Sequence, residues 1–421
     1  MPPPLKHPLK IGIQTWGSEG DIRPLIALAE ALVERGHQVE LVATRLGVVE
    51  LPTARPGLTV ALVPPGPPAD LAAFTARLGD QSSSWGLLKA LFRELFIPFL
   101  PEMEAAAARL VTGSDLLIGH FAVHPLQAAA RAAGKPYISI TYMPGLIPTA
   151  EAPPHPLPDL GRWFNPWLWR LAGWKLDGEL LATCRASFTR AGLQLTHILP
   201  DAWSSPTLNL VAASPAFWPA PRDWPAQHRL TGEFISARAP VPLPDALEAF
   251  LTAGPPPVYL GLGSPQQCRP EEATALLAEA AALCGRRAIV RSLAAAHPPW
   301  TTTGDILWCG AVDHRALFPR CAAVVHHGGA GTSHAAARAG VPSVAVTFLD
   351  EQGAWAAALR RAGVAPAHVH YRRVTPALLA RRIAEALSPE RVANARRLAQ
   401  AMAAENGIAT ACALIEAHAV A

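Results

Sequence analysis

The feature that most constrains the fold of this 421-residue chain is the stretch covering residues 322–359. An apolar run ends in the letters HHGGAGT, an alanine-rich helical pattern follows, and residues 340–342 (GVP) close it. Residues 343–348 then repeat the apolar strand pattern, and a second helical segment ends near Gly363. This order of strand, glycine-rich turn, helix, strand and helix predicts one βαβα unit of a parallel sheet.

The two strand-to-helix loops of this unit, residues 328–332 and 349–352, are expected at the same edge of the sheet, outside the carboxyl ends of the strands. In the first loop, glycines let the backbone approach a ligand, and the free N–H groups of the first helical turn favour an anion. Thr332 adds a hydroxyl and His327 can donate to a phosphate oxygen. The first loop therefore predicts a phosphate site.

The second loop offers Glu351 and Gln352, which suit a polyhydroxylated group better than an anion. Together the loops predict a nucleotide sugar, with phosphate at one end and sugar at the other. The alternative is a glycine-rich turn that serves only packing, beside a core histidine whose hydrogen bonds are satisfied. The paired histidines and the acidic-Gln loop one strand later favour the ligand site.

The letters HHGGAGT, then AGVPSVAV and then EQ, resemble the donor signature of inverting glycosyltransferases with the GT-B fold, especially the sterol and antibiotic glucosyltransferases. Their layout is also similar to the box of plant secondary-product glycosyltransferases. The resemblance implies that Glu351 and Gln352 hold sugar hydroxyls, although the family usually has Asp-Gln. It implies diphosphate contacts from His327, Gly329, Ala330, Gly331 and Thr332.

The N-terminal half opens with its own βαβ pattern: a strand at residues 10–15, a turn, a helix at residues 22–35 and a strand at residues 39–43. The turn GSEGD lacks the third glycine of a dinucleotide fingerprint, and no acidic residue follows the second strand. It resembles the GSRGD opening of the same family, with Glu19 in place of the arginine. We assign Gly17 and Ser18 of this turn to donor binding.

In that family the last residue of this motif is placed as the general base, which is Asp21 here. A carboxylate at the sheet edge can remove the proton of an attacking hydroxyl. The alternative is that Asp21 is only a helix N-cap, and one residue can do both. His120 and His124, in the stretch GHFAVH, are the rival bases and are also candidates for acceptor binding.

Aromatic residues concentrate at residues 161–175, GRWFNPWLWRLAGWK. One interpretation is a helix core or a hydrophobic cover on the N-terminal domain. The other is the wall of an acceptor cleft for a flat or lipophilic alcohol, because such pockets are lined by apolar and aromatic groups. On that interpretation Trp163, Phe164 and Trp167 bind the acceptor.

A proline-rich linker at residues 235–245 predicts two domains, at residues 1–234 and 246–421. We expect both to be Rossmann-like, doubly wound parallel sheets of the GT-B type that face each other across a cleft, with the last helix returning to the first domain. The resemblance places Ser264 near the donor phosphates. It also makes Val312 and His314, in GAVDHRALFPR, candidates for contact with the nucleobase, although Asp313 replaces the family's proline.

Composition excludes several classes of function. A formal charge of +4 with no basic run interleaved with aromatics disfavours a nucleic-acid partner. The six cysteines have no paired or metal-ligand spacing, no apolar run approaches about 18 residues, and the first residues lack an apolar signal region. We therefore expect a cytoplasmic protein, monomeric or homodimeric, with no integral membrane segment. Its excess of Arg over Lys, with abundant Ala and Pro, indicates a GC-rich bacterial genome.

No Asp-x-Asp sequence occurs, so nothing resembles the metal motif of the other major glycosyltransferase fold. With the family resemblance, the sequence predicts an inverting, metal-independent glycosyltransferase without a cofactor. It is expected to move a sugar from a UDP- or TDP-sugar to a hydroxyl of a small, lipophilic or aromatic natural-product acceptor. The alternatives are a non-catalytic auxiliary protein of the same family, or a GT-B nucleotide-sugar epimerase.

Overall fold

The chain divides into two compact units. The computed structural model describes residues 7–46, 49–64, 84–263, 269–292 and 298–420. Unit 1 consists of Met1–Ala73, Trp85–Ala237 and Asn406–Ala421, and unit 2 of Phe74–Ser84 and Arg238–Glu405. The main division therefore falls between Ala237 and Arg238, within the proline-rich segment.

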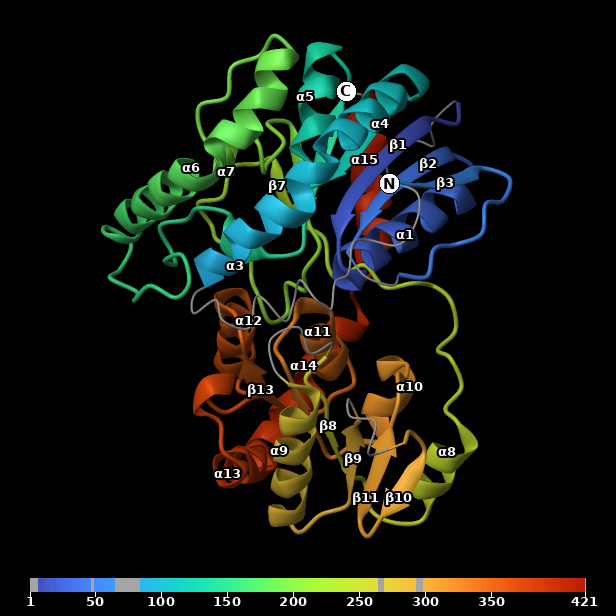
Figure 1. Cartoon of the computed structure of the whole chain (residues 1–421), viewed down its shortest axis with the longest axis vertical. Helices are drawn as coiled ribbons and strands as arrows, with labels where there is room; N and C mark the ends of the chain where they lie inside the picture. The colour runs from blue at the N-terminus through green and yellow to red at the C-terminus, as the bar shows by residue number, and fades with distance from the viewer. Residues whose placement is uncertain (1–6, 47–48, 65–83, 264–268, 293–297, 421) are drawn as a thin grey trace. The chain divides into compact units, whose positions relative to one another are not determined.

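Unit 1 is built on a parallel sheet whose seven described strands follow the order β3-β2-β1-β4-β5-β6-β7 (Figure 1). The inner strands are buried, mainly through apolar residues such as Ile13, Leu41 and Ile118, as expected for a sheet covered on both faces by helices, whereas the edge strands β3 and β7 are only partly buried. The strands are β1 (Lys10–Gly17), β2 (Gln38–Arg45), β3 (Leu58–Leu62), β4 (Leu116–His120), β5 (Tyr137–Thr141), β6 (Leu208–Val211) and β7 (His228–Leu230).

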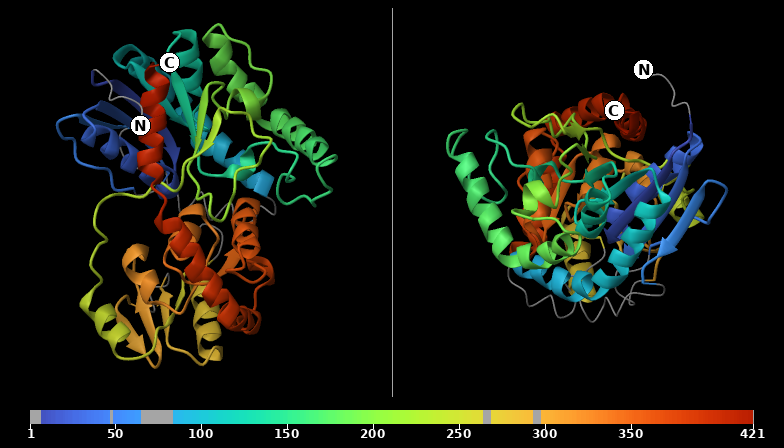
Figure 2. Two further views of the ribbon diagram at one scale, coloured as in Figure 1. Left: turned by 180° about the vertical axis from the view of Figure 1, so that it is seen from behind. Right: turned by 90° about the horizontal axis from the view of Figure 1, so that it is seen from above.

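The helices beside this sheet are α1 (Glu19–Glu34), α3 (Ser84–Leu91), α4 (Leu100–Gly113), α5 (His124–Ala132), α6 (Asn165–Arg190), α7 (Ile198–Asp201) and α15 (Gly407–Val420). The last of them comes from the C-terminal end of the chain and packs against α1 (Figure 2). Cys412 and Ile415 of α15 are buried in the core of unit 1, and Glu416 pairs with Arg35 at an N–O distance of 2.6 Å. Unit 1 is thus closed by residues that follow unit 2 in the sequence.

Unit 2 repeats this plan, with the strand order β10-β11-β9-β8-β12-β13-β14. Its strands are β8 (Val258–Leu260), β9 (Ala288–Arg291), β10 (Thr301–Thr303), β11 (Ile306–Cys309), β12 (Ala323–His326), β13 (Ser343–Thr347) and β14 (Val369–His370). Its helices are α8 (Asp245–Thr252), α9 (Pro270–Leu283), α10 (His314–Leu317), α11 (Ala330–Arg338), α12 (Asp350–Arg361), α13 (Pro376–Ala386) and α14 (Pro389–Ala403).

Two local features differ from the sequence-based expectation. The edge strand β10 runs antiparallel to β11 and was not predicted, because its three threonines are exposed and carry no apolar pattern. Helix α1 begins at Glu19, three residues before the predicted start at Ile22, with Ser18 at its N-cap. Asp21 is therefore in the first turn of α1, and the alternative interpretation, that it is the N-cap of this helix, is wrong.

By length and composition alone, residues Pro389–Ala419 could cross a membrane. The stretch comprises two helices, α14 and α15, that belong to different units. Leu398 and Met402 of α14 and Cys412 and Ile415 of α15 are buried.

Candidate functional site

The glycine-rich loop of unit 2 joins β12 to α11 at the carboxyl edge of the sheet. His326 ends the strand with its ring buried, and its Nδ1 accepts a hydrogen bond from the backbone N–H of Gly328 at 3.0 Å. Gly328 has φ +86°, a conformation that residues with a Cβ rarely adopt. His326, which precedes the predicted phosphate-binding residue His327, thus fixes the conformation of the turn. The sequence analysis did not assign this role to it.

The first turn of α11 follows Gly329, which is its N-cap. Ala330, Gly331 and Thr332 are the first three residues of this nine-residue helix, and the first helical hydrogen bond joins the N–H of Ser333 to Gly329 at 2.9 Å. Backbone N–H groups ahead of that bond have no partner within the helix, and they carry the positive end of its dipole. The loop therefore presents donors suited to an anion.

The second loop adjoins the first, as the sequence predicts. A Cβ placed on Gly328 would lie 2.9 Å from the carbonyl oxygen of Gln352. The side-chain oxygen of Gln352 accepts hydrogen bonds from the N–H groups of Phe348 (2.7 Å) and Leu349 (3.2 Å). Because the oxygen is used in this way, the amide NH₂ of Gln352 is the group that can donate to a ligand. Glu351, beside it, is exposed.

His327 lies between the loops that follow β8 and β12. A Cβ on Gly263 would meet its Nδ1 at 2.8 Å, and a Cβ on Gly329 would meet its Nε2 at 2.4 Å, so both glycines are needed for the ring to fit. Its buried Nδ1 has no hydrogen-bond partner among the described residues. Burial, with a smaller effect from the charge of Arg291, lowers the pKa of His327 to about 4. The ring is therefore neutral at pH 7 and can donate one N–H to a phosphate oxygen.

Arg291 was missed by the sequence analysis. It is the last residue of β9, which pairs with β8, so it lies at the same sheet edge as the glycine-rich loop. It hydrogen-bonds Tyr259, and its charge acts on both Tyr259 and His327. A cation at the end of a buried apolar run, in the letters AIVRS, was the signal that could have identified it.

The segment expected near a nucleobase lies at the start of α10. The ring of His314 stacks on Phe318 with a centroid distance of 4.2 Å, and Val312 packs against the same apolar core. Asp313 is the N-cap of α10 and accepts from the N–H of Arg315 at 2.9 Å. The ligand contacts predicted for Val312 and His314 stay predictions.

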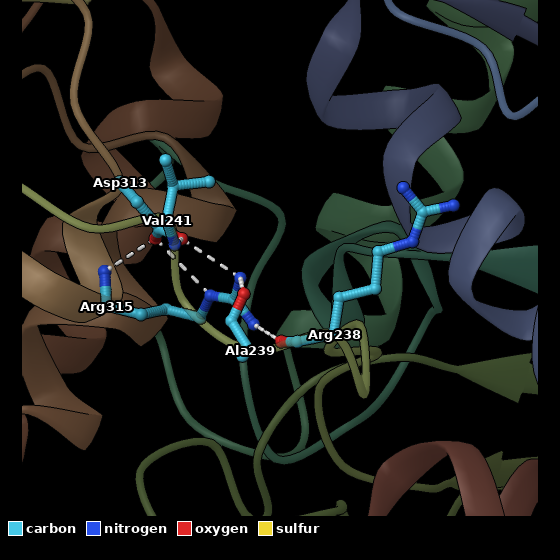
Figure 3. A network of polar contacts seen from close by, with 5 residues as sticks. All are labelled: Arg238, Ala239, Val241, Asp313 and Arg315. Carbon is cyan, nitrogen blue, oxygen red and sulfur yellow. Dashed lines mark hydrogen bonds and ion pairs between the residues drawn. The ribbon is translucent and has the colours of Figure 1, made fainter.

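Asp313 and Arg315 also hold the segment that follows the division between the units (Figure 3). Asp313 accepts a hydrogen bond from the N–H of Val241 at 3.0 Å, and the guanidinium of Arg315 donates to the carbonyl oxygen of Arg238 at 2.8 Å. A proline at position 313 could not accept the bond from Val241, so this departure from the family sequence has a structural role. Ser264, the remaining predicted donor contact in unit 2, is outside the described residues.

In unit 1 the turn after β1 arranges the carboxylate of Asp21. Its Oδ2 accepts from the backbone N–H of Ser18 at 2.7 Å and from the Ser18 hydroxyl at 3.0 Å. Gly17 has φ +138°, and a Cβ there would lie 2.3 Å from that oxygen. Gly17 and Ser18 thus shape the environment of Asp21, while their predicted donor contacts stay predictions. Burial raises the pKa of the Asp21 carboxyl although 35% of the side chain is exposed.

His120 lies next to this carboxylate. Its Nε2 is 3.8 Å from Oδ1 of Asp21, the oxygen that Ser18 does not use, and only 2% of its side chain is exposed. Neither ring nitrogen has a hydrogen-bond partner among the described residues, and burial lowers the pKa of His120 to about 3. Tyr142 stacks on this ring at 5.5 Å and donates its hydroxyl to the carbonyl oxygen of Asp21 at 2.7 Å.

His124 is in a different environment, at the start of α5. It is fully buried, with its Nε2 3.3 Å from the Ser187 hydroxyl and its Nδ1 3.7 Å from the sulfur of Cys184. Burial, as the largest cause, lowers its pKa to about 3. These contacts fix α5 to α6, so His124 has a structural explanation that His120 lacks.

The aromatic residues predicted to bind the acceptor lie at and just before the start of α6. Trp163, Phe164 and Trp167 are 87%, 63% and 66% exposed. They are therefore not part of a helix core, which was the alternative for this segment, although Trp169 of the same helix is buried. Their contact with an acceptor stays a prediction.

Comparison with known proteins gives relatives along the whole chain. Residues 286–414 match the family model described as "Erythromycin biosynthesis protein CIII-like, C-terminal domain". The chain is 34% identical to an O-mycaminosyltylonolide 6-deoxyallosyltransferase of Streptomyces fradiae, over 97% of each protein. It is 31% identical to the vancomycin aglycone glucosyltransferase of Amycolatopsis orientalis, over 97% of this chain and 98% of that protein.

Solved structures share the fold. The calicheamicin glycosyltransferase CalG4 superposes with a TM-score of 0.67 at 17% identity, covering 98% of each chain. The glycosyltransferase VinC, solved in complex with dTDP, gives a TM-score of 0.63 at 20% identity, covering 98% of this chain and 99% of that one. Both units thus occur together in chains of this architecture.

Proposed function

Since the chain belongs to the GT-B glycosyltransferase family that includes antibiotic glycosyltransferases and sterol glucosyltransferases, we propose that it transfers a sugar from a dTDP- or UDP-sugar to a hydroxyl of a natural-product acceptor. The observation that carries this proposal is the contact between the two loops of unit 2, at Gly328 and Gln352. This contact brings the glycine-rich loop, which is suited to an anion, next to the loop of Glu351 and Gln352, which is suited to sugar hydroxyls. The dTDP bound to VinC supports the choice of nucleotide.

The donor diphosphate is held by a neutral imidazole, a guanidinium and a helix N-terminus. His327 donates one N–H, Arg291 supplies positive charge, and the amides of Ala330, Gly331 and Thr332 complete the site. The amide NH₂ of Gln352 donates to a sugar hydroxyl, and Glu351 accepts from another. These groups meet the charge of the leaving diphosphate without a metal ion.

Asp21 is the general base of the reaction. Its Oδ2 is held by Ser18, while Oδ1 faces His120. A raised pKa makes the carboxylate a stronger base than an ordinary aspartate, whereas a pKa of about 3 makes the buried imidazole of His120 a weak one. His120 and Tyr142 position the carboxylate rather than accept the proton.

The reaction is a single displacement. Asp21 takes the proton of the acceptor hydroxyl as its oxygen forms a bond to the anomeric carbon. The bond from that carbon to the phosphate oxygen breaks, and the nucleoside diphosphate leaves with the electron pair. The configuration at the anomeric carbon is therefore inverted.

The five described cysteines are free thiols, which supports a reducing, cytoplasmic setting for this reaction.

The direct test is to incubate the full chain with dTDP- and UDP-sugars and a panel of polyketide, glycopeptide and sterol alcohols, and to measure product mass. Transfer to at least one alcohol, undiminished by a chelator, supports the proposal. An α-linked donor should give a β-linked product by NMR. Activity that a chelator abolishes and Mg²⁺ restores would exclude the metal-free diphosphate site, and an α-linked product would exclude the single displacement.

A further inference from the structure

Helix α6 of unit 1 is apolar on two opposite sides. Trp169, Leu176 and Leu180 are buried on the side that packs towards α5 and α7. The other side is exposed to solvent and includes two residues of the preceding turn. This exposed set, called the tryptophan face below, consists of Trp163, Phe164, Trp167, Leu171 and Trp174.

The spacing of these residues makes them one continuous surface. Positions 167, 171 and 174 are separated by four and three residues, which places their side chains on one side of α6, and Trp163 and Phe164 are exposed in the turn just before it. At 100° per residue, this side is opposite the buried positions 169, 176 and 180. Trp163 is 87% exposed and Trp174 is 75% exposed. Contiguous apolar surface of this kind marks an interaction site.

The charged residues between residues 160 and 176, which carry the tryptophan face, are all positive, and Asp159, Asp177 and Glu179 flank this segment. Arg162, Arg170 and Lys175 are exposed beside it, and no Asp or Glu occurs between residues 160 and 176. The flanking acidic residues interact within unit 1: Asp159 accepts from the side-chain amide of Asn165 at 2.9 Å, and the charge of Lys175 acts on Glu179. Asp177 accepts from His197 and from the N–H of Ile198, and Glu179 pairs with Lys89 at 2.6 Å. The face is thus apolar at its centre and cationic at its rim.

We propose that the tryptophan face binds unit 1 reversibly to an anionic phospholipid surface. Indole rings favour the boundary between headgroups and acyl chains, and Arg and Lys stems can lie along apolar surface while their charged ends reach lipid phosphates. The packing of α6 on α5 and α7 holds the rings on one side before any lipid is met, so binding requires no folding of the helix.

Two other occupants fit less well. A second copy of the same face would bring Arg170 and Lys175 against like charges. A small molecule would touch a ring such as that of Trp163 on one side only, because 87% of this side chain is exposed, whereas ligand pockets enclose most of their ligand. Lipid binding is tested without a sugar donor, so its outcome is separate from that of the proposed transfer reaction.

The test is flotation of the full chain with vesicles of equal parts phosphatidylglycerol and phosphatidylcholine, and with vesicles of phosphatidylcholine alone. We expect binding to the mixed vesicles that weakens with added salt. Leu171→Ser should weaken it about three- to tenfold and Trp174→Ser about tenfold or more, from the apolar area lost. Leu283→Ser in α9 is the matched control, because Leu283 is 56% exposed and Leu171 is 48% exposed.

The role of charge is tested separately. Replacement of Arg170 and Lys175 together by Gln should reduce binding to the mixed vesicles and flatten its salt dependence. Arg269→Gln, at an 81% exposed side chain in unit 2, should change neither. The proposal is overturned if the native chain floats with neither vesicle, or if Leu283→Ser weakens binding as much as Leu171→Ser. It is also overturned if the native chain sediments as a dimer that Leu171→Ser dissociates while no vesicle binding is seen.

Discussion

The two units place their candidate sites at the same point of the same topology. In each sheet the strand order reverses beside the first strand of the unit, between β1 and β4 in unit 1 and between β8 and β12 in unit 2. Asp21 follows β1 and His120 ends β4, while Gly263 follows β8 and His327 follows β12. The carboxyl edge at such a reversal is where open α/β sheets bind ligands.

The chemistry at these two points differs. Unit 1 offers the side chains of a carboxylate and an imidazole, one of them partly exposed. Unit 2 offers mainly backbone amides, made accessible by glycines, with His327 and Arg291 beside them. A proton acceptor needs one basic atom, whereas a diphosphate needs several donors around it. Topology thus fixes the place of a site, and the loop residues decide its reaction.

The largest effect expected from this division is loss of turnover in Asp21→Asn. The amide can still accept the hydrogen bonds from Ser18 but cannot take a proton at neutral pH. We expect kcat to fall by at least about a hundredfold with nearly unchanged folding. Asp115→Asn is the matched control, because Asp115 also accepts a backbone N–H, from Lys10 at 2.8 Å, away from the switch point. Retained turnover in Asp21→Asn would make Asp21 structural and return His120 to consideration as the base.

The second effect is on donor affinity in unit 2. His327→Ala removes a buried donor to a charged group, a contact that contributes about 1.5 to 3 kcal/mol. The Kd for the sugar nucleotide should therefore rise roughly ten- to a hundredfold. Calorimetry measures this directly, and an unchanged Kd would contradict the diphosphate assignment. Glu351→Ala should instead change which sugar is preferred.

A smaller effect is expected for Arg291→Gln. The substitution removes a positive charge from the edge that we propose holds the diphosphate, where the amides and His327 would remain to bind it. We expect the Kd to rise about tenfold, in line with a charge-assisted hydrogen bond. Arg286→Gln, at an exposed position before the same strand, should leave the Kd unchanged. If Arg291→Gln and Arg286→Gln raised the Kd equally, the loss of affinity would come from the change in net charge and not from a contact of Arg291 with the diphosphate.

Turnover, which we assign to Asp21 in unit 1, and donor affinity, which we assign to His327 in unit 2, should depend differently on pH. If Asp21 is the general base, as we propose, it must be ionised for turnover, so kcat/KM should fall with decreasing pH. The fall should begin above the ordinary aspartate pKa of about 3.9, because burial raises the pKa of Asp21. Affinity for the sugar nucleotide should stay constant between pH 7 and about 5, because His327, with a pKa of about 4, remains neutral there. Parallel pH profiles for the two quantities would contradict this separation.

The sequence predicted the parts of this arrangement that follow from pattern. Residues 322–359 were identified as a βαβα unit because apolar runs and glycines alternate there, and Asp21 was found through its motif. Arg291, Tyr142 and the approach of His120 to Asp21 were not predicted. They depend on which strands become neighbours in the sheet, since β1 pairs with β4 across about 100 residues of chain, and β9 reaches the loop after β12 only through β8.

The most direct test of the central claim is the affinity of Asp21→Asn for a dTDP- or UDP-sugar, measured by calorimetry beside that of His327→Ala. The account predicts that Asp21→Asn binds the donor within about threefold of the native Kd although it no longer turns over, and that His327→Ala binds it roughly ten- to a hundredfold more weakly. If Asp21→Asn lost as much donor affinity as His327→Ala, donor binding and proton removal would not be divided between the two switch points.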